Sequence, residues 1–162
     1  MNDDVSVELK ADQVSATAVV AAGPAEVFDY LRRPANHARI SGDHSVQRAM
    51  TGPELLGLGD NFGMSMRIAL PYRVTSRVVE FEQDRLIAWC HFFGHRWRWE
   101  LEEVEPGRTR VRETFDLGTA RLPAALRLIG LPAGHRGNVA KSVRNVAEHF
   151  RSTTSNESKP AD

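Results

Sequence analysis

Residues 86–117 read LIAWCHFFGHRWRWELEEVEPGRTRVRETFDL, and this stretch decides the fold. Apolar and charged side chains alternate along it, which is typical of β-strands that bury one face. Turn signals interrupt the alternation at Gly94-His95 and at Pro106-Gly107. The stretch therefore predicts two successive β-hairpins, with Gly107 in a left-handed conformation at the second turn.

The two turns also predict which residues face each other across the strands. Counting outward from the first turn pairs Phe92 with Trp97, Cys90 with Trp99 and Ala88 with Leu101. Counting outward from a loop at 105–107 gives Leu101–Val111, Trp99–Glu113 and Trp97–Phe115 on one face, and Glu100–Arg112 and Glu102–Arg110 on the other. The apolar face and the opposite-charge pairs select the same register in the second hairpin. Glu113 is the one residue that does not suit its apolar face.

The composition limits the class of protein. A chain of 162 residues suffices for one domain with a sizeable core, and a formal net charge of zero argues against a nucleic-acid partner. Cys90 is the single cysteine, which excludes a disulfide framework and a cysteine-based zinc site. No signal peptide is evident, and no stretch of about 20 apolar residues is present for stable membrane insertion. We therefore expect a cytoplasmic protein.

Periodicity predicts the elements on either side of the two hairpins. Alternating residues predict strands at 12–22, 44–51, 62–68 and 72–82. Helical spacing predicts short helices at 24–32, at 35–41 and after Pro123, and a long amphipathic helix at 137–151. Residues 1–11 are expected to form a flexible N-terminus and residues 152–162 a disordered tail, which leaves a single domain at 12–151.

These elements predict an α+β fold. Its expected form is a curved antiparallel sheet of seven strands around the long C-terminal helix, with two short helices between strands 1 and 2. That helix is the only element large enough to cover the apolar face of the sheet. Because the sheet carries more large inward-facing residues than one helix needs, a cavity is expected between sheet and helix.

Several features together carry a family resemblance. A strand is followed by Pro24 and by Val27-Phe28 on a short helix, a Gly57-x-Gly59 loop precedes a strand, residues 78–89 read VVEFEQDRLIAW, and the last helix ends near Phe150. In these respects residues 12–151 resemble the START-like (SRPBCC) superfamily, which includes polyketide cyclases/dehydrases and plant pathogenesis-related proteins. The resemblance implies the helix-grip fold, with the first strand beside the last, and an apolar ligand. Its members share no catalytic motif, so it implies no particular reaction.

Glu113 is the sharpest candidate for chemistry. Desolvation disfavours the ionised form of a carboxyl group that faces Trp, Met and Phe side chains, which suits general acid–base catalysis or hydrogen bonding to a ligand hydroxyl. A turn at 83–84 places Arg77 opposite Cys90, so that Arg77, Cys90, Trp99 and Glu113 would form one inward row. Arg77 would then orient a ligand. Alternatively, Arg77 lies on the outer face in a ladder of charges, and Glu113 only orders the cavity.

The side chains predicted to line the cavity are mostly aromatic or thioether groups of the strands, joined by two valines of the last helix. They are Phe62, Met64, Met66, Cys90, Phe92, Trp97, Trp99, Phe115, Val139 and Val143. Such a lining suits a flat or flexible apolar ligand. For each residue taken singly, a plain packed core is the alternative.

The remaining motifs point to few other sites. A predicted turn separates His91 from His95, with His91 facing outward beside Arg98, so no metal site is expected. No phosphate loop or dinucleotide fingerprint appears, and no cofactor is expected. His37 either borders the pocket mouth or lies on the surface. The apolar segment 122–131 leaves four alternatives open: a lid, a homodimer contact, a membrane-touching patch, or packing against the last helix.

Three functional hypotheses follow. The leading one is binding, with transport as an extension, of a hydrophobic small molecule such as a lipid, polyketide or aromatic metabolite. The alternative is an enzyme of the polyketide cyclase/dehydratase type, with Glu113 as acid/base and Arg77 as orienting group. The third is a protein-interaction domain with a filled core. A cavity beside Glu113 would separate the first two from the third.

Overall fold

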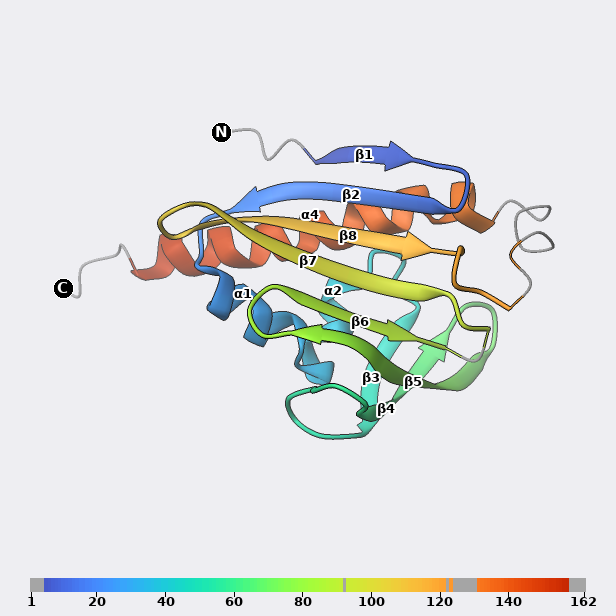
Figure 1. Ribbon diagram of the computed structural model, residues 1–162. Helices are drawn as coiled ribbons and strands as arrows, with labels where there is room; N and C mark the ends of the chain where they lie inside the picture. Colours follow the sequence, from blue (N-terminus) through green and yellow to red (C-terminus); the bar gives the residue numbers. More distant parts are fainter. Residues whose placement is uncertain (1–4, 92, 122, 124–130, 158–162) are drawn as a thin grey trace.

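The computed structural model describes residues 5–91, 93–121, 123 and 131–157 (Figure 1). The strands are β1 (Ser6–Leu9), β2 (Gln13–Val20), β3 (Val46–Thr51), β4 (Asn61–Arg67), β5 (Pro71–Glu82), β6 (Leu86–Cys90), β7 (Arg96–Glu105) and β8 (Arg108–Asp116). The helices are α1 (Pro24–Leu31), η1 (Pro34–Asn36), α2 (His37–Ile40) and α4 (Leu131–Glu157). The strands form one antiparallel sheet in the order β1-β2-β8-β7-β6-β5-β4-β3.

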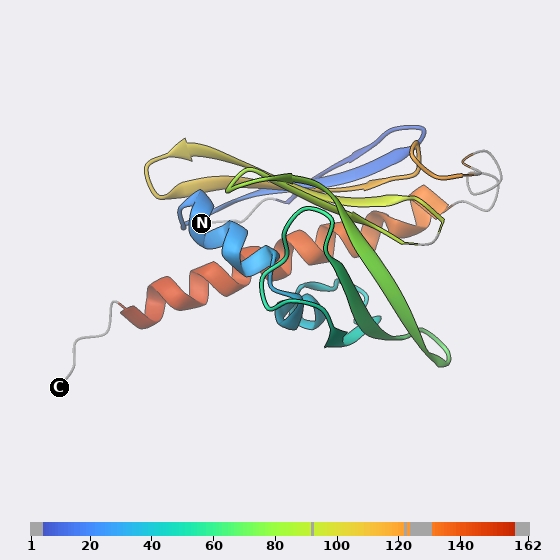
Figure 2. The same ribbon diagram turned by 60° about the horizontal axis from the view of Figure 1, so that its bottom comes forward.

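The curved sheet wraps around α4, which lies along its concave side (Figure 2). The buried side of α4 carries Val139, Val143, Val146 and Phe150, and the helix contacts β2 and β8. These two strands pair with each other, as the family resemblance implied for the first and last strands of the domain. The short helices follow β2 directly. The predicted α+β architecture is therefore confirmed.

The two ends of the chain differ from the prediction. Residues Ser6–Leu9, expected in a flexible N-terminus, form the edge strand β1, so the sheet has 8 strands instead of seven. Arg112 of β8 donates to Glu8 of β1 across 2.8 Å, a contact between residues far apart in sequence. Helix α4 continues to Glu157, into the segment expected to be a disordered tail. A strand of four residues is too short to show a clear alternation, so only its partner reveals it.

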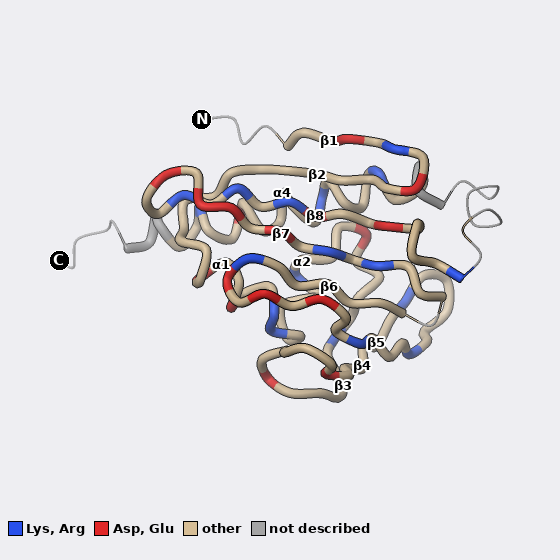
Figure 3. The backbone as a smooth tube through the Cα atoms, viewed as in Figure 1, with Lys and Arg blue, Asp and Glu red and all other residues tan. Residues whose placement is uncertain are grey.

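The register predicted for the second hairpin is confirmed. Leu101 pairs with Val111, Trp99 with Glu113, Trp97 with Phe115, Glu100 with Arg112 and Glu102 with Arg110. Gly107 has φ +72°, the left-handed conformation that the turn requires. Acidic and basic positions lie close together on β7 and β8 (Figure 3). The agreement places Glu113 on the concave face, where it is only 4% exposed.

The register predicted for the first hairpin is wrong. Trp89 pairs with Trp97, and Cys90 pairs with Arg96, not with Trp99. The connection is longer than a tight turn, because Gly94 donates to the carbonyl of His91 and lies against the chain at 119–121. A shift by an odd number of residues exchanges the two faces of a strand. It therefore turns Trp89 toward the interior and Cys90 away from it. Phe92, predicted to face Trp97, lies outside the described residues.

Strand β5 pairs with β6 through an irregular ladder. Arg77 faces Cys90 as predicted, but the register shifts between Val78 and Glu80. The inward residues of β5 are Val74, Ser76 and Val78, which are buried. Arg77 is exposed on the opposite face, so the predicted inward row of Arg77, Cys90, Trp99 and Glu113 is wrong. The outer-face alternative describes the position of Arg77.

Candidate functional site

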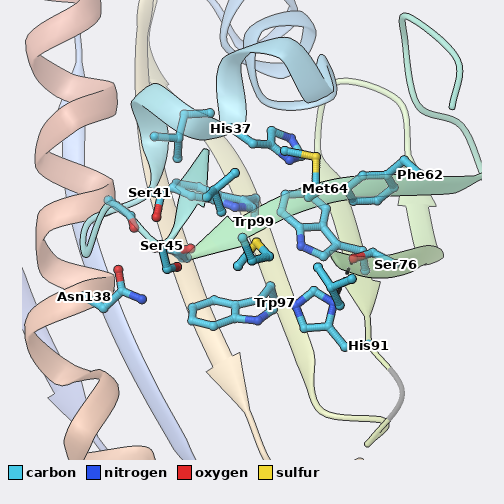
Figure 4. A pocket seen from close by; sticks show the side chains of 17 residues that line it. His37, Ser41, Ser45, Phe62, Met64, Ser76, His91, Trp97, Trp99 and Asn138 are labelled. Carbon is cyan, nitrogen blue, oxygen red and sulfur yellow. Dashed lines mark hydrogen bonds between the residues drawn. The ribbon is translucent and has the colours of Figure 1, made fainter. Parts of the chain in front are cut away.

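A cavity of about 100 Å³ lies between the concave face of the sheet and α4. The sheet side of its wall is apolar and aromatic, with Phe62, Met64 and Trp97 pointing inward (Figure 4). The side toward α4 is polar, and Asn138 of that helix belongs to it. The interior is therefore not fully packed beside Glu113, which argues against a domain with a filled core.

Glu113 is the acidic group of this cavity. Burial raises its pKa well above the ordinary value, and the negative charge of Asp43 adds to the shift. The Ser142 hydroxyl opposes the shift through a hydrogen bond to the carboxyl group. Ser142 Oγ accepts the backbone N–H of Gly42 at 3.1 Å, which leaves the hydroxyl proton for Glu113. Glu113 Oε2 is buried without a hydrogen-bond partner in the described protein.

A second polar group without a partner lies on the same side of the cavity. Asn138 Nδ2 donates to Asp43 Oδ2 across 3.2 Å, while Asn138 Oδ1 is buried and has no partner among the described residues. Ser41 and Ser45 also line this side. Buried polar atoms are nearly always hydrogen-bonded in folded proteins. Two unpaired oxygens in one cavity therefore mark a place where water or a ligand can supply the missing hydrogen bonds.

A serine–histidine pair lies on the side of the cavity away from α4. Ser76 Oγ and His91 Nδ1 are 2.8 Å apart (Figure 4). Burial, together with the neighbouring His95, lowers the pKa of His91 to about 4. His91 is therefore neutral at pH 7, and if Nδ1 accepts from Ser76, Nε2 carries the proton. The prediction that His91 faces outward beside Arg98 is wrong, because the altered register turns this residue inward.

His37 also forms part of the cavity wall. Its ring stacks on Trp89 with centroids 4.8 Å apart, and its Nε2 lies 2.9 Å from the carbonyl oxygen of Leu31. Burial lowers the pKa of His37 to about 4 despite that hydrogen bond. The short helix α2 positions this imidazole over the sheet. Of the two alternatives that the sequence left open, the structure therefore excludes a surface position.

The residues predicted to line the cavity fall into distinct groups. Those that line it are Phe62, Met64, Met66, Trp97 and Trp99. Those that are buried in the packed core without lining it are Phe115, Val139 and Val143. Cys90 and Arg77 lie outside the cavity, so their predicted placement within it is wrong. Phe92 lies outside the described residues.

Sequence reasoning missed several cavity residues for identifiable reasons. Trp89 and His91 were assigned to the wrong face because the first turn was placed incorrectly. Asn138 and Ser142 lie one helical turn apart, beside the apolar stripe of Val139 and Val143. Polar residues at the border of a buried stripe are a usable signal, since they must find partners inside the protein.

Among the described residues, no group of three or more His, Cys, Asp and Glu side chains is arranged to hold a metal ion. The rings of His91 and His95, on either side of the predicted turn, are neighbours with centroids 5.4 Å apart. No described helix has the length and apolar character needed to cross a membrane.

Replacing Glu113 by Gln is expected to change how stability depends on pH. The unfolded carboxyl ionises near its ordinary pKa of 4.5, whereas the folded one keeps its proton to higher pH. Stability is therefore lost as pH rises from about 4.5 through the folded pKa, by about 1.4 kcal/mol for each unit of pKa elevation. Glu113→Gln removes this loss. The free energy of unfolding of the variant should therefore rise, relative to that of the natural protein, from pH 5 to pH 8.

Urea denaturation at both pH values measures this difference. The matched control is Glu148→Gln, at an exposed position of α4, which should leave the pH dependence unchanged. A stability difference between Glu113→Gln and the natural protein that is the same at pH 5 and pH 8 would contradict the burial of an ionisable group.

The sequence of this chain is similar to those of known proteins. The sequence model of one family, described as polyketide cyclase/dehydrase and lipid transport, matches residues 11–151. Two relatives from Mycobacterium tuberculosis, described as uncharacterized proteins Rv0088 and MT0096, are 41% and 40% identical over 109 residues. The match covers 67% of this chain and 49% of each relative. The chain thus spans about half the length of the curated relatives it matches.

Solved structures share the fold at low sequence identity. A Rhodobacter sphaeroides protein has a TM-score of 0.66 at 14% identity, covering 92% of this chain and 99% of its own. The Zhui aromatase/cyclase from Streptomyces sp. R1128 has a TM-score of 0.63 at 18% identity, covering 88% and 94%. An AHSA1-like protein from Aeromonas hydrophila has a TM-score of 0.57 at 20% identity, covering 93% and 99%. The predicted helix-grip fold is therefore confirmed.

Proposed function

The chain belongs to the polyketide cyclase/dehydrase and lipid transport family, and on that premise we propose that it binds a small, largely apolar molecule carrying a hydroxyl or carbonyl group. The bound molecule would occupy the cavity between the sheet and α4. The observation that carries the proposal is the unpaired, buried Oε2 of Glu113 in a wall that is otherwise mostly aromatic and thioether. A hydroxyl group on the ligand would pair with that oxygen.

The polar groups of the cavity favour a neutral ligand. A carboxyl group whose pKa is raised by burial is protonated over a wider pH range, and it then both donates and accepts. An anionic ligand would meet the unpaired Asn138 oxygen, and it would be repelled by Glu113 whenever that carboxyl group is ionised. With Nδ1 accepting from Ser76, the Nε2–H of His91 offers a donor to a carbonyl group. Hydroxylated or carbonyl-bearing aromatic molecules fit this set of groups.

The size of the cavity limits the ligand further. A volume of about 100 Å³ is below the 300–1,000 Å³ typical of pockets for drug-sized molecules. An apolar cavity of about 150 Å³ binds benzene, so the space here is close to that of one aromatic ring. A larger lipid or polyketide requires the wall to move. Met64 and Met66 are suited to such movement, because their unbranched side chains change rotamer easily.

Phenol and toluene test the proposal as a matched pair of one-ring probes. Phenol should bind the natural protein more tightly than toluene does. In Glu113→Leu its affinity should fall about tenfold or more, because its hydroxyl loses a buried partner, while toluene should bind at least as well. Isothermal titration calorimetry measures both affinities, and native mass spectrometry of the purified protein identifies any molecule it already carries.

The control for this experiment is Glu148→Leu, an equivalent change at an exposed position of the same helix that carries Ser142. It should leave both affinities unchanged. Equal loss of phenol and toluene binding in Glu113→Leu would show that the substitution had damaged the cavity as a whole. No binding of either probe to the natural protein would contradict a one-ring ligand in the cavity as it stands.

A second candidate function is catalysis of the polyketide cyclase/dehydratase type. The elevated pKa of Glu113 favours it, since a general acid or base works best with a pKa near the operating pH. Glu113 would take a proton next to a ketide carbonyl or polarise that carbonyl. Arg77 no longer belongs to this hypothesis, because it is exposed outside the cavity. Glu113→Gln should then abolish turnover of a poly-β-ketone while its binding is retained, whereas a pure binding protein would show no turnover in either form.

A further inference from the structure

The connection between β4 and β5 presents apolar side chains to solvent. Ile68 is 76% exposed and Leu70 is 77% exposed, and Tyr72 beside them is 41% exposed. The two strands extend beyond the rest of the sheet, with this connection at their far end (Figure 2). Single exposed apolar residues are common on protein surfaces. Two of them at the tip of a projecting hairpin form a surface that a partner can cover.

Basic residues surround this tip. Arg67 and Arg73 flank it on β4 and β5, and Arg48 lies on β3; all three are exposed. Ser65 faces Arg48 on one neighbouring strand and Arg73 on the other, so both arginines are on the same face of the sheet. Figure 3 shows basic positions at the connected ends of β4 and β5.

Acidic partners are missing from this part of the sheet. No Asp or Glu occurs from residue 61 to residue 79, although the whole chain has a formal net charge of zero. Within the described residues none of Arg48, Arg67 and Arg73 forms an ion pair. Further along the same sheet, by contrast, Arg98 pairs with Glu80. The basic charge around the tip is therefore uncompensated, unlike that on β7.

Asp43 acts on the inner side of this hairpin: burial raises the pKa of Tyr72, and the negative charge of Asp43 adds to that shift. Its carboxylate already accepts hydrogen bonds from Ser41, from the Ser45 backbone and from Asn138. It therefore belongs to the polar side of the cavity and leaves the arginines of the outer face without a counter-charge.

We propose that the β4–β5 tip docks reversibly on the surface of a membrane that contains anionic lipids. Ile68 and Leu70 enter the interface, and Arg48, Arg67 and Arg73 contact lipid phosphates. The order of residues along the hairpin fits the layers of a bilayer surface, because the apolar groups are at the tip and the cations follow behind it. No described helix spans a membrane, so the contact is peripheral.

The docking surface adjoins the cavity. Met66 pairs with Tyr72 beside the tip, and Met66 and Val74 line the cavity from the inner face of the same hairpin. A docked hairpin would therefore hold that part of the cavity wall close to the lipid. The docking itself depends only on the outer residues, so it goes beyond the proposed function and is tested without the ligand.

Sedimentation with sucrose-loaded vesicles tests this proposal on the full chain. The protein should bind vesicles of phosphatidylcholine mixed with phosphatidylserine more tightly than vesicles of phosphatidylcholine alone, and raised salt should weaken the binding. The double variant Ile68→Ser, Leu70→Ser should bind at least about tenfold more weakly. The triple variant Arg48→Gln, Arg67→Gln, Arg73→Gln should bind about 100-fold more weakly, or about fivefold for each arginine.

The matched control is Leu58→Ser, at a 67% exposed leucine in the connection between β3 and β4. It should bind vesicles like the natural protein. Absence of vesicle binding would overturn the proposal, as would equal binding to both vesicle types, or full binding by the double or triple variant. Phenol affinity, measured in parallel, should be the same in the hairpin variants as in the natural protein, which separates failure of docking from failure of the cavity proposal.

Discussion

Acidification from pH 7 to pH 4.5 is expected to destabilise the Glu113→Gln variant, and two buried histidines that must accept protons on unfolding account for about 4 to 5 kcal/mol of the loss. His37 and His91 both have a pKa lowered to about 4 by burial, against an ordinary value of 6.5. Each contributes stability that is fully present above pH 6.5 and is lost as pH falls toward 4. The loss is about 2 to 2.5 kcal/mol for each histidine at pH 4.5.

The experiment uses the Glu113→Gln variant because Glu113 changes stability with pH in the direction opposite to the histidines. Its raised pKa makes the natural protein less stable as pH rises above about 4.5, which partly cancels the histidine effect over the same range. The variant removes that contribution and leaves the histidines visible. A loss of 4 to 5 kcal/mol is a large fraction of the 5 to 15 kcal/mol that stabilises a typical domain.

Urea denaturation between pH 4.5 and pH 7 measures the effect. Adding His91→Gln to the background should reduce the pH dependence by about 2 to 2.5 kcal/mol, because glutamine accepts a hydrogen bond from Ser76 without titrating. The control is His44→Asn, which replaces an exposed histidine with φ 56°, a conformation that asparagine tolerates. Stability that does not change between pH 7 and pH 4.5 would show that the two imidazoles are not buried as neutral groups.

The two hairpins show which parts of the fold could be predicted from the sequence. In the second hairpin the apolar face and the Glu–Arg pairs independently indicate one register, and the structure has that register. In the first hairpin the turn at Gly94-His95 was the only evidence, and it was wrong. The connection around Gly94 is held by contacts with residues 119–121, which follow β8. Local sequence does not contain those contacts.

The residues of the candidate site could be predicted only where the register of their hairpin was predicted correctly. Glu113, Trp97 and Trp99 lie on the strands of the second hairpin, so the correct register placed them at the cavity. His91 and Trp89 depended on the first hairpin and were assigned to the wrong face. Ser142 of α4 reaches Glu113 only because helix and sheet meet in three dimensions. A sequence therefore predicts the residues of one hairpin well, while groups supplied by separate elements need the folded structure.

Gly42→Ala is expected to destabilise the protein by about 3 kcal/mol and to disturb the polar side of the cavity. A Cβ atom at Gly42 would lie 2.2 Å from the carbonyl oxygen of Asn138 and 2.7 Å from Cβ of Lys141. Both atoms belong to the rigid body of α4, so the connection between α2 and β3 must move away from the helix. The hydrogen bond from the Gly42 N–H to Ser142 would then be lost.

Thermal denaturation measures the change, with an expected fall in Tm of about 6 to 12 °C for a chain of this size. The matched control is Gly137→Ala in α4, where an added Cβ meets nothing within 4 Å. Alanine favours a helix over glycine, so this control should stabilise the protein by about 0.5 to 1 kcal/mol. A Gly42→Ala protein as stable as the control would mean that the connection does not pack against α4.

The same pair of variants also tests how Glu113 is held. With the N–H of residue 42 displaced, the Ser142 hydroxyl has no fixed donor to orient it, and the hydrogen bond that opposes the rise in the pKa of Glu113 weakens. Gly42→Ala should therefore weaken phenol binding more than toluene binding, while Gly137→Ala changes neither. Glycine at position 42 thus links the close approach of helix and loop to the chemistry of a carboxyl group on the opposite wall of the cavity.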